Sequence, residues 1–192
     1  MYGLEAVTVP SNLEVGLKEW SPQNVSIKTN PEAIIWAVDG VDDNSVAFAA
    51  RLMEKGVEVR IIDKEALLSK QSLSRGSIAV LAMDNPEYQD LSETVNSIAT
   101  ELDISVLSIE SGFGAEELPD WGGRHFRLLE RPQIAILSQS GFSSYDVGVS
   151  WWSLDHHLGI RHSQIDASLV NYADLRLSLI LISEPTRLER IS

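Results

Sequence analysis

Short apolar runs alternate with amphipathic segments along the chain. One run at 33–38 ends at the turn signal Asp39-Gly40, and a second run lies at 57–62, as expected for two strands. Between them, apolar residues recur at the spacing of one helix face, namely Val46, Ala49, Ala50 and Met53. Gly56 follows, at the place where a left-handed residue commonly ends a helix. The pattern predicts a strand, a helix and a strand, which is a βαβ unit.

The same alternation continues through the rest of the chain. Further strands are predicted at 77–82, 104–109, 133–137, 163–165 and 177–183. Helices are predicted from Asn85 to Leu102, with Leu91, Val95, Ile98 and Leu102 on one face, and from Asp146 to Leu158, which Gly159 ends. The sequence therefore predicts an α/β protein with a βαβ-rich lobe at 1–131 and a second lobe at 132–192.

The two ends of the chain carry separate expectations. The first residues lack the basic region, apolar core and cleavage site of a secretory signal. The strand predicted at 177–183 is followed by only nine residues, whereas a buried parallel strand is normally followed by a covering helix and further strands. We therefore expect the second lobe to be incomplete. An unpaired strand edge there favours a homo-oligomer or aggregation.

The composition excludes several classes of protein. Hydrophobic residues make up 44% and charged residues 22% of the 192 positions, as in ordinary globular domains. The absence of cysteine excludes disulfide scaffolds, cysteine-ligated zinc and thiol nucleophiles. A formal net charge of −13 opposes nucleic-acid binding. No apolar run approaches the ~20 residues that a membrane span needs, so neither nucleic acid nor a membrane is an expected partner.

The histidines are the first candidates for chemistry. His156, His157 and His162 lie within seven residues, with Asp155 beside them. A zinc site needs three or four convergent ligands, and adjacent histidines lie about 100° apart around a helix. No HExxH or HxxE motif is present, and the segment that begins at His125 does not supply one. We therefore predict no metal site and expect exposed histidines at a helix end.

A serine-rich loop follows the strand predicted at 133–137. It contains the candidate ligand-binding residues Ser138, Ser140, Gly141, Ser143 and Ser144. Folds of the α/β class place ligand loops after strands, and backbone N–H groups at the start of the next helix, here 144–147, can cradle an anion.

Two other interpretations of this loop remain open. The first is a plain Ser/Gly turn in which Ser144 or Asp146 caps the helix. The second is a hydrolase that uses Ser140 or Ser143 with a histidine, although the serines do not match the G-x-S-x-G pattern of a nucleophile elbow.

Three further patterns are interpreted as structural. The four glycines at 111–123 do not form the dinucleotide-binding motif G-x-G-x-x-G. The acidic segment 39–43 lacks the spacing of a calcium loop and is interpreted as a solvated turn. Trp151 and Trp152 lie in a predicted helix, where we expect one ring in the core and the other partly exposed; a pair of aromatic rings at an interface is the alternative.

Several of these segments together resemble one family. Ser45–Arg60 and Arg75–Val80 resemble the region that follows the catalytic domain in bacterial zinc carboxypeptidase-like proteins, of the carboxypeptidase A type. The linker of the same proteins is similar to Glu101–Val106, Ser111-Gly112 and Gly123–His125. The start of their C-terminal class I glutamine amidotransferase-like domain is similar to Arg131–Leu137, Gly141–Ser144, Trp152–Gly159, Asn171–Asp174 and Leu177–Ile182.

The resemblance implies a flavodoxin-like second lobe and a non-catalytic accessory or scaffold role. The family's peptidase holds zinc with an HxxE motif and a distant histidine, and a glutamate acts as base; nothing in this chain matches them, so zinc and the active site are expected in a preceding domain. A class I amidotransferase needs a nucleophilic cysteine, which the chain lacks. The implied partner is that neighbouring peptidase domain, and the parent proteins are often exported. From the residues alone, the alternative is a stand-alone anion-binding module that uses the loop 138–147.

Overall fold

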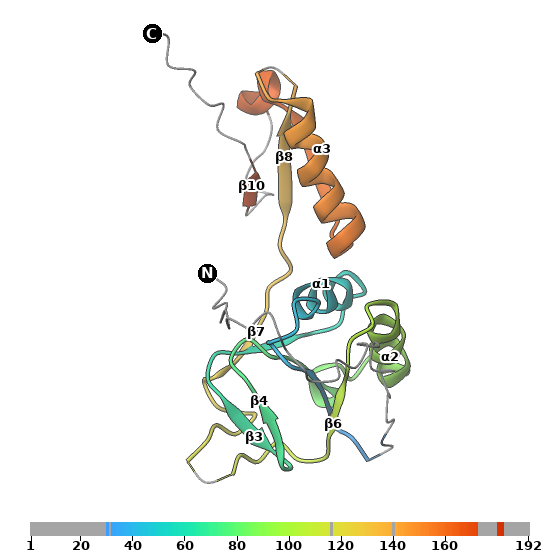
Figure 1. Ribbon diagram of the computed structural model, residues 1–192, viewed down its shortest axis with the longest axis vertical. Coiled ribbons are helices and arrows are strands. Elements are labelled where there is room, and N and C mark those ends of the chain that lie inside the picture. Colours follow the sequence, from blue (N-terminus) through green and yellow to red (C-terminus); the bar gives the residue numbers. More distant parts are fainter. Residues whose placement is uncertain (1–29, 31, 116, 140, 173–179, 183–192) are drawn as a thin grey trace, which may run out of the picture.

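The structure is a computed structural model that describes residues 30, 32–115, 117–139, 141–172 and 180–182. Its helices and strands are arranged in two lobes, which the segment 129–133 connects (Figure 1). The prediction of a mixed α/β protein is confirmed.

The first lobe is built on a five-stranded sheet in the order β6-β1-β5-β2-β7, with every neighbouring pair antiparallel. Its elements are β1 (Ile35–Val38), α1 (Ser45–Glu54), β2 (Arg60–Ile62), β3 (Ala66–Leu68), β4 (Gln71–Leu73), β5 (Ile78–Leu81), the 3₁₀ turn η1 (Ala82–Asp84), α2 (Leu91–Glu101), β6 (Leu107–Ile109) and β7 (Phe126–Leu128). β3 and β4 form a separate hairpin. The sequence pattern predicts neither this hairpin nor β7, because three-residue strands give no readable alternation.

The pairing of the strands differs from the predicted βαβ unit. β1 and β2 run parallel, but β5 lies between them and is antiparallel to both: Ile78 is the register partner of Val38 and of Ile61. In the same way, β1 separates the parallel strands β5 and β6. This connectivity is the split βαβ arrangement. The predicted strand, helix and strand are present, with β5 inserted between the two strands; hydrophobic periodicity identifies a strand but not its partner.

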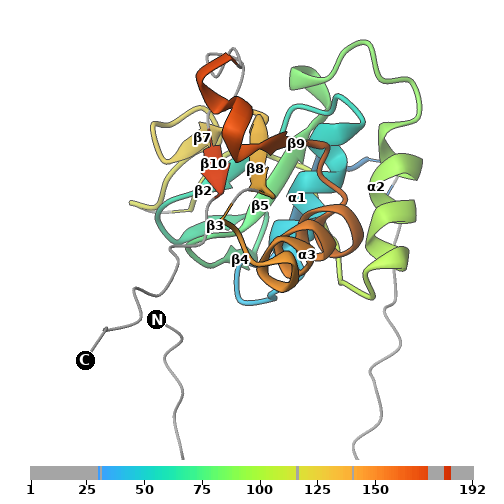
Figure 2. The same ribbon diagram turned by 90° about the horizontal axis from the view of Figure 1, so that it is seen from above.

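Both faces of this sheet are covered, and all four residues of β1 and of β5 are buried. One face packs against α1 and α2 (Figure 2), through residues that include Trp36, Val38, Val80, Phe48, Leu52, Val95 and Ile98. The opposite face packs against the β3–β4 hairpin and the segment before β7, through Ile35, Ala37, Ala79, Leu68, Leu73, Trp121 and Phe126. Double coverage explains why these antiparallel strands have the continuous apolar runs that are typical of parallel sheets.

α1 is buried on two sides rather than one. Phe48 and Leu52 pack on the sheet of the first lobe, whereas Ala50 packs against the second lobe. Val46, which the spacing places on the buried face, is 61% exposed. The predicted apolar stripe is therefore wrong in part, because the spacing of one helix carries no information about a second lobe docked on its flank.

The second lobe is a three-stranded parallel sheet in the order β10-β8-β9. Its elements are β8 (Ile134–Ser138), α3 (Ser144–Trp152), the π-helical turn η2 (Ser153–Leu158), β9 (His162–Asp166), the 3₁₀ helix η3 (Ala167–Tyr172) and β10 (Ile180–Ile182). The strands predicted at 133–137 and 163–165, and the helix between them, are confirmed. β10 lies within the run predicted at 177–183, whose other residues lie outside the described part. β9 and β10 flank β8 on opposite sides, so the strand order reverses there, as it does in doubly wound sheets.

Glu54, at the end of α1, connects the two lobes. Arg131 donates from Nε to Glu54 Oε1 at 3.1 Å and from Nη2 to Oε2 at 2.7 Å. The backbone N–H of Arg161 donates to Oε1 at 3.2 Å, and its Nε lies 3.4 Å from Oε2. Since the Glu54 side chain is only 12% exposed, its carboxylate depends on these partners. Beside them, Ala50 packs with Ile134 in the apolar contact between the lobes.

We predict that Glu54→Ala lowers the free energy of unfolding by about 2 kcal/mol, because it removes hydrogen bonds between charged groups and leaves two arginines without their acceptor. The matched control is Glu101→Ala, since Glu101 is 58% exposed and contacts Arg51 at 3.2 Å; that loss should stay below about 0.5 kcal/mol. Urea denaturation measures both values, and equal losses would contradict this role of Glu54.

Candidate functional site

The predicted ligand loop lies at the carboxyl end of β8 and leads into α3 (Figure 1). Two residues of the loop have left-handed backbone conformations, Gln139 with φ 60° and Gly141 with φ 94°. The N–H of Phe142 donates to the carbonyl of Gln139 at 2.8 Å, which closes a tight turn. The loop therefore stands at the edge of the parallel sheet, beside the point where the strand order reverses, which is where doubly wound proteins bind ligands.

The hydroxyl groups of this loop do not form a common site in the part of the chain that the structure describes. Ser138 is buried, and its Oγ donates to the carbonyl of Ile165 at 3.4 Å. Ser143 occupies the N-cap of α3 without a side-chain capping hydrogen bond, and Ser144 is exposed in the first turn. Ser140 lies outside the described residues. What the loop offers to a ligand is therefore the backbone N–H groups at the start of α3 rather than a set of hydroxyls.

Two carboxylates share this edge of the sheet. Asp166, at the end of β9, is the register partner of Ser138, and its Oδ1 accepts hydrogen bonds from the N–H and Oγ of Ser168 at 2.9 and 2.8 Å. Asp146 lies in the first turn of α3. Their negative charges oppose an anion at the helix N-terminus. Asp166 was not among the predicted site residues, although an acidic residue directly after a predicted strand is a signal for this position.

His125 forms a pair with a carboxylate. Its Nδ1 donates to Asp63 Oδ1 at 2.7 Å, and the N–H of Asp63 donates to the His125 carbonyl at 3.0 Å. Nε2 accepts a hydrogen bond from Nε of Arg124 at 3.4 Å. Nδ1 is thus held by the carboxylate, and the guanidinium of Arg124 lies beside Nε2. The pair joins the end of β2 to the start of β7.

The other described histidines do not converge. His156 stacks on Trp152 with ring centroids 5.4 Å apart. His162 donates from Nδ1 to the carbonyl of Ile160 at 3.1 Å. His156 and His157 are both exposed in η2, at a helix end as expected. Within the described ranges, no group of three or more histidine, aspartate or glutamate side chains is placed to hold a metal ion.

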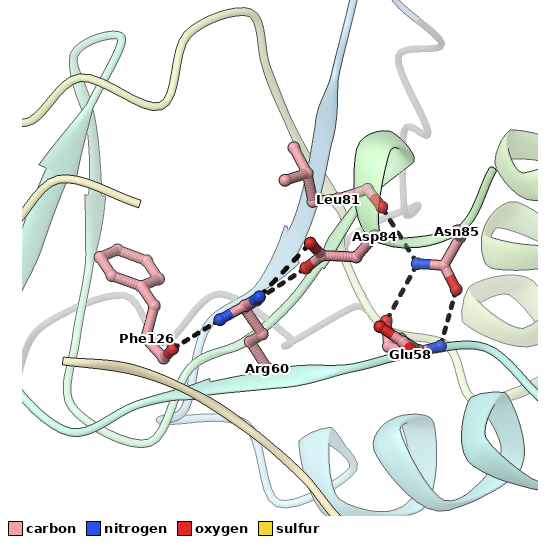
Figure 3. A network of polar contacts seen from close by, with 6 residues as sticks. All are labelled: Glu58, Arg60, Leu81, Asp84, Asn85 and Phe126. Carbon is pink, nitrogen blue, oxygen red and sulfur yellow. Dashed lines mark hydrogen bonds and ion pairs between the residues drawn. The ribbon is translucent and has the colours of Figure 1, made fainter. Parts of the chain in front are cut away.

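A buried polar network lies at the end of β5 (Figure 3). Arg60 donates from Nε to Asp84 Oδ2 at 2.6 Å, from Nη2 to Asp84 Oδ1 at 3.3 Å, and from Nη1 to the Phe126 carbonyl at 3.0 Å. Hydrogen bonding to the Asp84 carboxylate raises the pKa of Arg60 above its ordinary value, although burial acts in the opposite direction. The guanidinium also lies 5.8 Å from the centre of the Trp121 ring.

Asn85 extends this network to Glu58, which precedes β2, and to Leu81 in β5. Its Oδ1 accepts from the Glu58 N–H at 2.7 Å, and its Nδ2 donates to the carbonyls of Glu58 at 3.1 Å and Leu81 at 3.0 Å. The residue is 6% exposed. All its amide groups thus bind backbone, and the network fixes β7, β2 and the turn after β5 to one another.

Cavities of about 360 to 540 Å³ lie away from the serine loop. The first, of about 360 Å³, is lined by Arg131, Arg161 and His162 at the amino ends of β8 and β9. Both arginines already bind Glu54, whose carboxylate compensates one of their two positive charges. Another, of about 540 Å³, is bordered by Asp84 and Asn85 of the network. The polar side chains named at these two cavities already form hydrogen bonds or ion pairs with other residues of the chain.

Trp151 and Trp152 are 40% and 54% exposed, and α3 contains no buried residue. The expectation that one of the two rings lies in the core is therefore wrong. Other side chains form the core of the second lobe, where Leu154 and Ile160 pack on Ile134. A three-stranded sheet offers too little surface to cover two indole rings as well.

Comparison with protein-family models, curated proteins and solved structures finds no match to this chain. Among the described residues, no helix has the length and apolarity needed to cross a bilayer.

Proposed function

We propose that this chain is a non-catalytic accessory and scaffold region of a zinc carboxypeptidase-like protein, with the peptidase active site in another domain. One observation supports the scaffold role: the polar side chains best arranged for chemistry connect parts of the fold. Arg60 with Asp84, Asn85 with Glu58, His125 with Asp63, and Glu54 with Arg131 each join residues at least 24 positions apart in the sequence. Side chains that are paired in this way stabilise the fold, and we propose that they do not take part in a catalytic reaction.

The family assignment within this proposal rests on the sequence resemblance at 33–183. Under it, the partner is the neighbouring peptidase domain, and zinc belongs to that domain. The donors of this chain do not fit a catalytic zinc site. The HxxE motif is absent, and the described residues bring no three suitable side chains together.

The test is an assay of the purified chain with equimolar zinc and peptides that report release of a C-terminal residue. We expect no stoichiometric zinc and no hydrolysis above the blank. Zinc bound at one equivalent together with C-terminal hydrolysis would overturn the proposal. A panel of ester substrates tests for a serine hydrolase. We expect no hydrolysis above the blank, and activity that Ser143→Ala or Ser140→Ala removes would overturn the proposal.

The second candidate is the anion-binding module at 138–147. It is favoured by the position of the exposed first turn of α3 at the reversal of strand order. Thermal shift with millimolar phosphate, compared with chloride at equal ionic strength, distinguishes the two functions, because only a bound ion gives a saturable rise at concentrations too low for the general stabilisation by excluded salts. A rise in melting temperature that Asp166→Asn increases further would support the anion site instead.

A further inference from the structure

The outer face of α3 carries an apolar stripe that no other described segment of the chain covers. Tyr145, Val149, Trp152 and His156 follow one another at intervals of four, three and four residues, which places them on one side of a helix. Tyr145 is 85%, Val149 67% and Trp152 54% exposed, and His156 is exposed and stacks on Trp152. Contiguous exposed apolar surface of this kind marks interaction sites, and tryptophan and tyrosine are the residues that dominate binding energy there.

We infer that α3 is a self-association surface, on which α3 of a second copy of this chain packs in antiparallel orientation about a two-fold axis. A two-fold interface must be self-complementary: each residue that protrudes on one copy needs a hollow on the same face of the other. The stripe has this property. The ring of Trp152 protrudes, and Gly148 lies one turn before it with open space where a Cβ would stand. With the axis midway between them, Trp152 of each copy enters the hollow at Gly148 of the other.

The exposed area is that of a weak contact. Full side-chain areas of about 150–250 Å² for aromatic residues, scaled by the exposed fractions along the stripe, give about 400 Å² on each copy. Two copies then bury about 800 Å², which is the size of a weak, transient interface.

The charges favour the antiparallel orientation over the parallel one. Asp146 lies in the first turn of α3, and His156 and His157 lie in the last turn of η2. Antiparallel packing places Asp146 of one copy beside the histidines of the other and sets unlike ends of the two helix dipoles side by side. The net charge of −13 on each copy is the opposing force, so salt that screens this repulsion should tighten the dimer.

The first experiment is sedimentation equilibrium of the full chain from about 5 to 500 μM, at low and high salt. We expect a monomer–dimer equilibrium that tightens with salt.

Trp152→Ala should weaken dimerisation by about 30-fold, as loss of a central aromatic side chain does. Gly148→Arg should abolish it by filling the hollow, while far-ultraviolet circular dichroism and melting temperature are retained. Phe113→Ala, which removes an 80% exposed ring from the first lobe, is the matched control and should leave the equilibrium unchanged.

The second experiment uses the absence of cysteine from the chain. Val149 lies next to the proposed axis, where two packed helices bring equivalent Cα atoms within the roughly 4.4–6.8 Å that a disulfide spans. Oxidised Val149→Cys should therefore form a covalent dimer, whereas Val46→Cys, at a similarly exposed helical valine, should not.

A monomer at every concentration overturns the inference, as does a dimer that Gly148→Arg and Trp152→Ala leave intact. Equal cross-linking of the two cysteine variants overturns it as well. Peptidase activity or anion binding would overturn the proposed function and leave these measurements unaffected.

Discussion

Asn85→Ala is expected to lower the free energy of unfolding by about 3 kcal/mol. The substitution removes three hydrogen bonds, a buried one to the Leu81 carbonyl and two partly buried ones to the N–H and carbonyl of Glu58. Each hydrogen bond lost costs about 1 kcal/mol. Urea or guanidinium denaturation followed by tryptophan fluorescence measures the loss, because Trp36 and Trp121 are buried in the same lobe.

Asn96→Ala is the control for this prediction. Asn96 lies in α2, and its Nδ2 has only a 3.5 Å contact to the Ser92 hydroxyl. Alanine is a better helix former than asparagine, so this variant should be as stable as the parent chain or slightly more stable. A loss at Asn85 no larger than the change at Asn96 would show that the amide network contributes little to the first lobe.

Local chain geometry was the part of the fold that the sequence predicted best. Gly56 and Gly159 end their helices with φ values of 84° and 69°, as their positions indicated. In α2, Leu91, Val95 and Ile98 are buried, as their spacing required. These features depend on residues within one turn of each other, and the energetic preference of a glycine or of an apolar stripe is expressed there without help from distant segments.

Features set by distant segments were not predicted. Asn85 was interpreted as the opening of a helix, but α2 begins only at Leu91, because the Asn85 side chain binds the backbone of Glu58 and Leu81 instead. The insertion of β5 between β1 and β2 has the same origin. Such choices depend on partners more than 20 residues away in sequence, and a single sequence does not record them.

In the candidate site too, the features set by nearby residues were predicted and those set by distant residues were not. The serine loop was expected after a strand, and it lies there; its neighbour Asp166 comes from the next strand and was missed. The pairing of His125 with Asp63 joins residues 62 positions apart, and no sequence motif predicts this pair. The exposed stripe of α3 has a helical spacing, but spacing alone does not tell whether a stripe faces a core or solvent.

The close approach of two turns in the first lobe leads to the second prediction with a large effect. Gly40 follows β1, and its backbone N–H donates to Ser77 Oγ at 3.1 Å. A Cβ at this position would stand 2.3 Å from the Gly76 carbonyl carbon and 2.5 Å from the Ser77 nitrogen. Both atoms belong to backbone that is itself fixed, since the Gly76 N–H donates to the Ile62 carbonyl at 2.8 Å and the Ile62 N–H donates to the Ser77 carbonyl at 2.9 Å.

Gly40→Ala is therefore expected to lower the free energy of unfolding by about 3 to 4 kcal/mol, because the methyl group can be accommodated only by moving the segment before β5 away from the end of β1. Gly122→Ala is the matched control: nothing lies within 4 Å of its Cβ position, so reduced freedom of the unfolded chain should leave it neutral or up to about 1 kcal/mol more stable. Parallel chemical denaturation of the two variants gives the comparison. Similar stabilities would mean that the turns at 40 and 76 do not touch in solution, and the order β1-β5-β2 would then need to be re-examined, since this contact lies at the place where the inserted strand begins.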